Sequence, residues 1–389
     1  MFREIKNLKK ACQRIAKAVK QKEKIIIFAD GDLDGVTSAL LLEESVKQLG
    51  GTIAFVCFSD RNEDGYGLSE KAVQKIKEYA PGLLIVLDCG ISSFEGVQLA
   101  ASNGLEVIII DHHEVLGKLP SPALVVDPKQ PFDKYAFKKL SAVALTYRLS
   151  EKILGRKMNG GLRCRLWELA ALGTIADMMP EEDYNKIVID GALQCAEGFR
   201  KTEWIAFHVL IEQLGIAQEA PRQIFQKIAS ILNITPMYNY QAASYLFLQE
   251  KEKSKARDWA RFLIQQAQER QKRIGEIVFE IEQSLEKERE HLTFIFKGST
   301  SWEQVLTGPV ASKICFKTHK PAFIFKIGPE KCRGSVRMPS GTDAIKALNY
   351  CEKFLDVYGG HPVAAGFTAP KDKIEQLEKC LLEYFKNNS

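Results

Sequence analysis

The sequence lacks the features of a membrane protein, a secreted protein or a zinc-stabilised domain. No apolar run reaches the ~20 residues that a membrane-spanning helix needs. Charged residues interrupt the apolar ones in the first twenty residues, so we expect this segment not to be a signal peptide. The nine cysteines include no C-x-x-C pair, so their spacing disfavours a zinc site, and we expect reduced, buried thiols in a cytoplasmic protein without membrane attachment.

Internal repeats and low-complexity segments are also missing. The chain has 389 residues, of which 46% are apolar, so the default expectation is two domains with a core each. The net charge of +5 is mildly basic, which permits a polyanionic partner without requiring one.

The N-terminal third alternates short β-rich runs with helical patterns. This alternation predicts parallel strands joined by crossover helices. Strands are expected at 25–29, 52–58, 83–87, 106–110 and 123–126, and helices at 35–49, 69–79 and 93–103. Apolar residues at three- and four-residue steps between 5 and 19 predict an amphipathic helix that docks on this domain.

The rest of the chain predicts a helical region and a second α/β unit. Residues 138–285 read as helical, and 250–290 predict one long charged helix that links two domains. Its Arg270, Lys272 and Arg273 could touch a phosphate backbone, although a solvated helix face is the simpler interpretation. Strand-like runs at 292–297, 321–328 and 333–338 and helices near 343–356 and 371–386 predict the second α/β unit.

Acidic and imidazole side chains follow several of the predicted strands. Three acids end the first strand (Asp30, Asp32, Asp34), one ends the third (Asp88), and Asp111, His112 and His113 follow the fourth. Ligands bind at the carboxyl ends of the strands in parallel sheets, so one edge should bring these side chains together. Gly31 and Gly35 allow the backbone to turn and to direct neighbouring carboxylates at one point.

Such a group of side chains predicts a metal centre. A lone Asp at a strand end is more often a helix N-cap, and a lone His is more often a satisfied core residue. Their joint occurrence at three strand ends favours a site for divalent cations, because gathered carboxylates repel one another without a cation. Oxygen ligands with imidazole suit Mn²⁺ or Mg²⁺, and two such ions can activate water for attack on phosphorus.

A second candidate site lies in the C-terminal unit. Gly359 and Gly360 allow backbone N–H groups to approach an anion, His361 could donate to a phosphate, and Arg337 offers a forked donor. Taken singly, a turn and a surface arginine explain these residues equally well.

Several motifs resemble those of a known family. D-x-D-x-D-G-x-x-S (30–38), D-C-G (88–90), D-H-H (111–113) and G-T-I-A-D (173–177) resemble the four motifs of the DHH-family phosphoesterases. RGSVR (333–337) and GGHPVAAG (359–366) resemble the associated DHHA1 domain. Within the family, the chain is most similar to RecJ-type exonucleases specific for single-stranded DNA, in segments 60–69, 125–131, 137–145, 173–180 and 308–325.

The resemblance implies a domain division and a role for each motif residue. It implies a DHH domain at 1–198, a helical connector at 199–288 and a smaller DHHA1 domain at 289–389. Asp88 would bridge the two ions, and Asp30 would supply a ligand where Phe28 replaces a histidine of many relatives. Asp111 would orient His112, and His113 would contact the scissile phosphate. The implied metal ligands are Asp30, Asp32, Asp34, Asp88, His112 and Asp177, and the implied substrate-binding residues are Ser335, Arg337, Gly359, Gly360 and His361.

The activity implied by the resemblance is hydrolysis of single-stranded DNA from 5′ to 3′ with release of mononucleotides, dependent on a pair of Mn²⁺ or Mg²⁺ ions. Replication or repair proteins are conceivable partners. One alternative keeps the chemistry but changes the substrate to short RNA oligomers, a cyclic dinucleotide or 3′-phosphoadenosine phosphate. Another is a non-catalytic scaffold in a replication complex, which is disfavoured because every motif acid is present.

Two departures from RecJ-type sequences bear on substrate binding. Residues 232–240 read LNITPMYNY where an N-A-A-G-R stretch is usual. The sequence also ends at Ser389, where larger members continue into an OB-fold. Since OB-folds supply a stacking platform for single strands, we expect weaker affinity for long strands.

Overall fold

The computed structural model describes residues 4–60, 67–115, 117–195, 202, 204–234, 236–287 and 292–387. The chain forms two compact units, Met1–Ala267 and Gln268–Ser389, and the boundary between them falls within one long helix. This α/β organisation, with the smaller unit at the C-terminus, confirms the predicted fold class. The three-part division into 1–198, 199–288 and 289–389 stays a prediction.

A five-stranded parallel sheet is the centre of the first unit. Its strand order is β2-β1-β3-β4-β5, and every neighbouring pair is parallel. The strands are β1 (Ile25–Ala29), β2 (Ile53–Phe58), β3 (Gly82–Leu87), β4 (Leu105–Ile110) and β5 (Leu124–Val126). Each lies within one residue of its predicted position, because buried apolar runs bounded by turns leave little choice of register.

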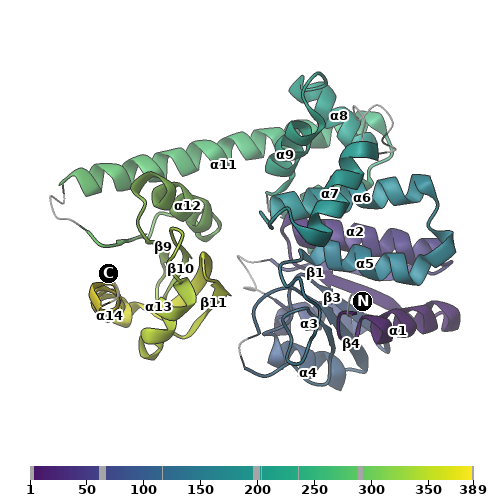
Figure 1. Ribbon diagram of the computed structural model, residues 1–389, viewed down its shortest axis with the longest axis horizontal. Coiled ribbons are helices and arrows are strands. Elements are labelled where there is room, and N and C mark those ends of the chain that lie inside the picture. Colours follow the sequence, from purple (N-terminus) through teal and green to yellow (C-terminus); the bar gives the residue numbers. More distant parts are fainter. Residues whose placement is uncertain are drawn as a thin grey trace. The chain divides into compact units, whose positions relative to one another are not determined.

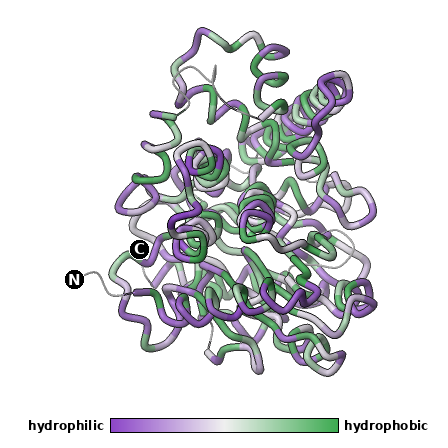
Figure 2. The backbone as a smooth tube through the Cα atoms, turned by 90° about the vertical axis from the view of Figure 1, so that its right-hand side faces the viewer, coloured by the Kyte–Doolittle hydropathy of each residue, from purple (hydrophilic) through white to green (hydrophobic). Residues whose placement is uncertain are grey.

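Both faces of this sheet are buried, so neighbouring residues of one strand serve different cores. Ile25 and Ile27 pack on one side, while Ile26 and Phe28 pack on the other. Helices α1 (Leu8–Gln21), α2 (Leu33–Gln48), α5 (Ala142–Leu154) and α6 (Gly160–Ala176) contribute to the first core, and α3 (Glu70–Ile76) and α4 (Phe94–Ser102) to the second (Figure 1). In Figure 2, hydrophobic stretches of the tube (green) run mainly through the interior, and hydrophilic stretches (purple) lie mainly in the peripheral turns.

The remaining elements of the first unit are mainly helical, as predicted. They are α7 (Asp183–Cys195), α8 (Ile205–Leu214), α9 (Pro221–Leu232), a hairpin of β6 (Met237–Tyr238) and β7 (Gln241–Ala242), and α10 (Ala243–Gln249). The long helix α11 spans Lys253–Lys287, close to the predicted 250–290. It buries Ala260 and Leu263 in the core of the first unit and Ile274 and Ile277 in a core of the second.

The second unit contains a mixed five-stranded sheet of order β11-β12-β10-β9-β8. Its strands are β8 (Ile295–Ser299), β9 (Ala322–Ile327), β10 (Lys331–Arg337), β11 (Val357–His361) and β12 (Ala364–Pro370), and its helices are α12 (Thr307–Thr318), α13 (Ala344–Tyr350) and α14 (Ile374–Asn387). Only β8 and β9 pair in parallel among the described strands of this sheet. The glycine-rich 358–367 segment lies in the β11–β12 hairpin rather than in a loop.

The cysteines correct one prediction. Cys164 and Cys195 form a disulfide, and Cys351 and Cys380 form another, so these four are not reduced thiols. Folding brings together residues 31 and 29 positions apart, which the spacing alone could not indicate. The five free cysteines are buried, as expected. Across the part of the chain that the structure describes, no helix has both the length and the apolar character to cross a bilayer.

Candidate metal centre

Three of the predicted acids continue the hydrogen-bond ladder beyond the ends of adjacent strands. The backbone N–H of Asp30 donates to the carbonyl of Leu87, at 3.1 Å. The N–H of Asp88 donates to Ile110, at 3.0 Å, in the same way. The N–H of Asp111 donates to the carbonyl at the end of β5, at 3.2 Å. The carboxyl edge of the sheet therefore aligns these acids, as the strand pattern predicted.

The predicted ligands come together in three overlapping groups. Within each group the potential ligand atoms all lie within 4.8 Å of one another. The groups are Asp30, Asp32 and Asp88; Asp34, His112 and Asp177; and Asp88, His112 and His113. Because Asp88 and His112 are each shared by two groups, the side chains form one continuous centre rather than separate sites.

His112 lies at the middle of this centre. Its Nε2 lies 3.2 Å from an Asp88 oxygen and 3.6 Å from an Asp177 oxygen. Its ring is buried, at 1% exposure, so bulk water does not compete at this position. Asp177 ends α6 and reaches the centre from a different part of the fold, so the fourth motif joins the other three only in the tertiary structure.

Asp34 is held by the start of a helix. Its two carboxylate oxygens accept the backbone N–H groups of Ala142 and Val143, each at 2.8 Å. Burial raises the pKa of Asp34 well above its ordinary value, and the charges of Asp177 and Asp32 raise it further. The two N–H donors oppose this shift in pKa but do not outweigh it.

Asp88 has the same character. Burial raises the pKa of its carboxyl well above the ordinary value, and the nearby charges of Asp34 and Asp32 add to the effect. Its backbone is left-handed, with φ of 59°, which is uncommon outside glycine and directs the side chain into the centre. Crowded, buried carboxylates of this kind fit a bound divalent cation, because the cation removes the repulsion that raises their pKa.

The loop around Asp30 is built from close backbone contacts. The Ser59 hydroxyl donates to an Asp30 oxygen at 2.5 Å and accepts the N–H of Gly31 at 3.2 Å. Asp32 caps α2 by accepting the N–H groups of Asp34 and Gly35. A Cβ at Gly35 would lie 2.2 Å from the Asp30 carbonyl oxygen, so only glycine permits this packing. Asp32 can therefore cap α2 and still face the metal centre.

Asp111 accepts hydrogen bonds from both histidines that follow it and from a neighbouring loop. One oxygen accepts from the His113 ring Nδ1 at 2.8 Å and from the backbone N–H of His112 at 2.7 Å, and the other accepts the N–H of Ile91. Asp111 thus reaches His112 through its backbone and reaches His113 through its ring. The implied orientation of the His112 ring by Asp111 stays a prediction.

The Asp111–His113 pair has shifted titration behaviour. Burial alone would raise the pKa of Asp111, but the charge of His113 and its hydrogen bond hold it below its ordinary value. Burial would lower the pKa of His113, but the Asp111 carboxylate and its hydrogen bond raise it to about 9. His113 therefore carries a positive charge near neutral pH in the metal-free protein.

Two further polar residues at this edge of the sheet had not been singled out from the sequence. Ser59 follows β2 and orients Asp30. Asp127 follows β5 and is fully buried, and burial raises its pKa to about 8, with a further contribution from the charge of Asp111. Both residues lie at the carboxyl edge of the sheet, as the predicted ligands do. Their position just after a strand could have identified them from the sequence.

The predicted substrate-binding residues of the second unit share one face of its sheet. Arg337 pairs with Ala364, which pairs with His361, and Ser335 pairs with Gly366, which pairs with Gly359. Residues opposite one another in antiparallel strands point to the same side, so this face bears an arginine, a histidine and a hydroxyl beside bare glycine backbone. Gly360 lies between Gly359 and His361 with φ of 134°, a region that favours glycine.

Arg337 is well placed but is not freely solvated. Its Nη1 donates to the Val336 carbonyl at 2.9 Å, and burial lowers its pKa. Ser335 shares a 2.9 Å hydrogen bond with the Thr307 hydroxyl at the start of α12. A desolvated guanidinium beside exposed backbone is suited to hold a phosphate or carboxylate.

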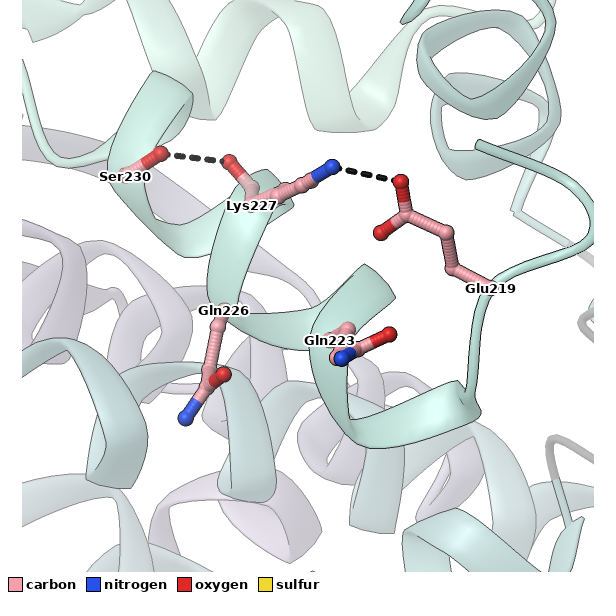
Figure 3. Close-up of a pocket in the computed structure, with 5 residues that line it drawn as sticks. All are labelled: Glu219, Gln223, Gln226, Lys227 and Ser230. Atoms are coloured by element: carbon pink, nitrogen blue, oxygen red, sulfur yellow. Dashed lines mark hydrogen bonds and ion pairs between the residues drawn. The ribbon is translucent and has the colours of Figure 1, made fainter. Parts of the chain in front are cut away.

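A separate hollow of about 460 Å³ lies along α9 (Figure 3). It is lined by Glu219, Gln223, Gln226, Lys227 and Ser230, and Lys227 forms an ion pair with Glu219 at 2.5 Å. None of these residues belongs to the three potential metal groups found among the described residues. This hollow is therefore not part of the metal centre.

Family models match both units. Residues 24–174 match the DHH family, N-terminal domain, and residues 291–387 match the DHHA1 domain. The chain therefore contains a DHH-family N-terminal domain followed by a DHHA1 domain. The DHH match contains every acid and histidine of the centre except Asp177, and the DHHA1 match contains all of the predicted substrate-binding residues.

Curated proteins similar to this chain include single-stranded-DNA-specific exonucleases. RecJ of Bacillus subtilis is 33% identical over 388 residues, which cover 99% of this chain and 48% of the relative. RecJ of Thermus thermophilus is 30% identical, with coverage of 93% and 52%. The chain therefore spans about half the length of these two relatives.

Solved structures share the fold. A crystal structure of exonuclease RecJ bound to manganese superposes with a TM-score of 0.77 at 25% identity, and the match covers 99% of this chain and 95% of that one. RecJ from Thermus thermophilus in complex with Mn²⁺ gives a TM-score of 0.82 at 23% identity, over 100% of this chain and 56% of that one, which supports the fold alone.

Proposed function

We propose that this chain is a metal-dependent phosphodiesterase that acts on single-stranded DNA as an exonuclease. The observation that carries the proposal is the continuous centre of carboxylates and imidazoles in which Asp88 and His112 are each shared by two ligand groups. The similarity over 99% of the chain to a single-stranded-DNA-specific exonuclease supports the choice of substrate. Mn²⁺ or Mg²⁺ would occupy the centre.

The donor set suits such cations. Asp30, Asp32 and Asp88 would hold one ion, and Asp34, Asp88, His112 and Asp177 the other, with Asp88 shared between them. A pair of divalent cations supplies Lewis-acid activation of water and neutralises charge that develops on the reacting phosphate. The buried carboxylates keep their positions through contacts made by the protein alone, such as the two N–H donors on Asp34.

His113 would donate to the phosphate. Asp111 engages its Nδ1 at 2.8 Å, so Nε2 is the second donor of the protonated ring. The Asp111 carboxylate favours the protonated form of this ring, which would offer a charge-assisted hydrogen bond to a phosphate oxygen. Such a bond favours the more negative transition state over the substrate.

The finer parts of the proposal concern the direction and the products. We propose cleavage from 5′ to 3′ with release of mononucleotides, in the cytoplasm and alongside replication or repair proteins. Arg337 and His361 would hold phosphates of the substrate, supported by their shared row on β10, β12 and β11.

A length series of labelled substrates tests this proposal. The wild-type chain would be assayed with Mn²⁺ on single-stranded DNA of increasing length, labelled at either end, beside short RNA oligomers, a cyclic dinucleotide and 3′-phosphoadenosine phosphate. We expect mononucleotides from single-stranded DNA of every length. Activity restricted to oligomers of a few nucleotides would indicate that the substrate is a small molecule rather than long single-stranded DNA.

Two variants test the centre itself. Asp111→Ala and His112→Ala should each abolish hydrolysis, whereas His319→Asn serves as a matched control, because His319 is an exposed histidine in a left-handed position outside the centre. Equal rates in all three would reject the metal centre, and a fully ligated but inactive wild-type protein would favour a non-catalytic scaffold.

A further inference from the structure

One fully buried asparagine joins two segments that carry parts of the metal centre. Asn185 lies in the first turn of α7 and is 0% exposed. Its side-chain nitrogen donates to the carbonyl of Lys139 at 2.8 Å and to the carbonyl of Pro180 at 3.0 Å. Both partners are acceptors only, so the amide nitrogen has to face them. Asn185 therefore ties the loop before α5 to the loop after α6.

Each of these loops leads to a carboxylate of the centre. Lys139 stands three residues before Ala142, whose backbone N–H holds one oxygen of Asp34 at 2.8 Å. Pro180 stands three residues after Asp177. Asp34 and Asp177 belong to the same potential ligand group, so the two loops together determine how far apart these carboxylates lie.

The position of Asp177 depends on the end of α6 rather than on the edge of the sheet. The N–H of Met179 donates to the Thr174 carbonyl at 3.3 Å, and Met178 has positive φ, 54°, which closes the helix in a common way. These features are internal to the helix end, so they do not fix the distance from Asp177 to Asp34. Contacts between segments have to set that distance.

A second buried contact joins the same two segments. The hydroxyl oxygens of Ser141 and Thr174 lie 2.7 Å apart, and both residues are 0% exposed. The Thr174 hydroxyl donates to the Ala170 carbonyl at 2.7 Å, so Ser141 is the donor in the hydrogen bond that the two hydroxyls share. Ser141 also caps α5 by accepting the N–H of Ala144. We call Asn185, Ser141 and Thr174 the polar clamp.

Asn185 is not needed for the apolar packing of α7. Val188 and Ile189 already bury the helix in the core of the first unit. The side-chain oxygen of Asn185 is buried and accepts no hydrogen bond within the described part of the chain. Such a group is unfavourable, and an apolar side chain of similar size would avoid it. The property that asparagine adds at this position is therefore its pair of N–H donors.

We propose that Asn185 is a positioning residue that sets the distance between Asp34 and Asp177, and with it the affinity for the ion that these carboxylates share. This inference rests on the proposed function, because it concerns the same metal centre. Metal–ligand distances have to lie within about 0.2 Å of their ideal values, so a small drift of one segment weakens binding even when every ligand is present.

The expected size of the effect follows from other metal sites. Groups that orient metal ligands are worth about 10- to 100-fold in metal affinity. Asn185 acts through two backbone segments rather than on a ligand directly, so we expect the lower end, about 10-fold.

The experiment measures the binding of Mn²⁺ to the full chain without substrate, by electron paramagnetic resonance of the free ion. Wild type should bind two ions. Asn185→Leu should weaken the binding of one ion about 10-fold and change that of the other much less, because the clamp does not contact Asp30 or Asp32. Thr174→Val, which removes the second contact of the clamp at almost the same shape, should act in the same direction.

The matched control is an asparagine at the opposite end of α6. The side chain of Asn159 accepts the N–H of Leu162 at 2.9 Å and caps this helix. The helix has 17 residues, so Asn159 lies roughly 25 Å from Asp177 along its axis. Asn159→Ala should lower Tm by about 2–4 °C and leave both Mn²⁺ affinities unchanged.

Kinetics on single-stranded DNA give a second readout, taken well below the Tm of each variant. At limiting Mn²⁺, Asn185→Leu should have a lowered kcat and an unchanged KM for DNA. A Mn²⁺ concentration about 10-fold higher should restore its kcat, because the ligands themselves are intact. A variant that is only less stable would show the wild-type dependence on Mn²⁺.

The outcomes separate the two proposals. Wild-type Mn²⁺ affinity in Asn185→Leu would overturn the positioning role and leave the nuclease proposal intact, and Thr174→Val decides in the same way if Asn185→Leu does not fold. Equal weakening in Asn159→Ala would also overturn the positioning role, because general loosening of α6 would then explain the effect. The expected weakening in a protein whose wild type binds two ions but hydrolyses no DNA would overturn the nuclease proposal and support the role of Asn185.

Discussion

The crowding of carboxylates at the metal centre predicts that Asp88→Asn stabilises the metal-free protein and removes its response to metal. Asp88 is buried, and its oxygens lie within 4.8 Å of those of Asp30 and Asp32. Asparagine has nearly the same shape and tolerates the left-handed backbone at this position, so the change removes charge with little other disturbance.

The magnitude follows from Coulomb's law. Two unit charges 4.8 Å apart repel by roughly 3.5 kcal/mol at an effective dielectric constant of about 20. The net gain should be smaller, because the raised pKa already relieves part of this repulsion through proton uptake and because His112, 3.2 Å away, loses a carboxylate partner. We expect Asp88→Asn to raise the free energy of unfolding by about 1–3 kcal/mol, and each kcal/mol should raise Tm by roughly 2–4 °C for a unit of this size.

The pH dependence has a definite sign. A carboxyl whose pKa is raised in the folded protein holds its proton better there than in the unfolded chain. Its contribution to stability is complete below the ordinary value of 3.8 and is lost as the pH rises through the folded pKa. The metal-free wild type should therefore lose stability from about pH 4 upward, and Asp88→Asn should lose less.

Thermal unfolding in chelator and in Mn²⁺ measures both effects. Mn²⁺ at about 100 times its Kd should stabilise wild type by about 2.7 kcal/mol per site, and Asp88→Asn should respond much less. Asp190→Asn, an exposed acid in an ion pair with Lys186, is the control and should change stability by no more than about 0.5 kcal/mol. A Mn²⁺ shift in Asp88→Asn as large as in wild type, or destabilisation of its metal-free form, would refute the reasoning.

Three further predictions concern other parts of the fold. Asp111→Asn weakens the hydrogen bond to the His113 ring, so kcat should fall about 10²-fold or more, while the Mn²⁺-induced shift in Tm persists. Loss of both the activity and the Tm shift would instead indicate that Asp111 is a metal ligand. Gly35→Ala places a Cβ 2.2 Å from the Asp30 carbonyl oxygen and should destabilise by about 1–3 kcal/mol in denaturant unfolding, and a neutral result would contradict this packing. Thiol titration of the denatured, unreduced protein should count five free cysteines, and a count of nine would exclude both disulfides. The Cys164–Cys195 disulfide closes a loop of about 31 residues, so its reduction should lower the free energy of unfolding by about 3–4 kcal/mol.

Local patterns in the sequence were sufficient for the first sheet. Buried runs such as 25–29 and 107–110 favour strands, because they are short, apolar on both faces and bounded by turns. Their carboxyl ends fall at one edge of any parallel sheet, which is why Asp30, Asp88 and Asp111 could be grouped before their geometry was known.

Contacts that depend on distant segments were not accessible in this way. The second unit shows this clearly, since the β11–β12 hairpin was hidden in a glycine-rich segment and α12 was not predicted. Glycine weakens strand propensity, and only pairing of Gly359 with Gly366 reveals the strand. The disulfide between Cys164 and Cys195 likewise depends on the packing of α6 against α7.

The sequence by itself determined which chemical groups this protein has and at which strand ends they stand, because burial and backbone pairing act over a few neighbouring residues. Only the tertiary structure decided how those groups are bonded. It turned Asp111 toward the ring of His113, placed the start of α5 against Asp34 and brought Tyr238 to Trp259. Each of these contacts joins atoms whose separation depends on the packing of whole elements, and no local pattern of residues records that packing.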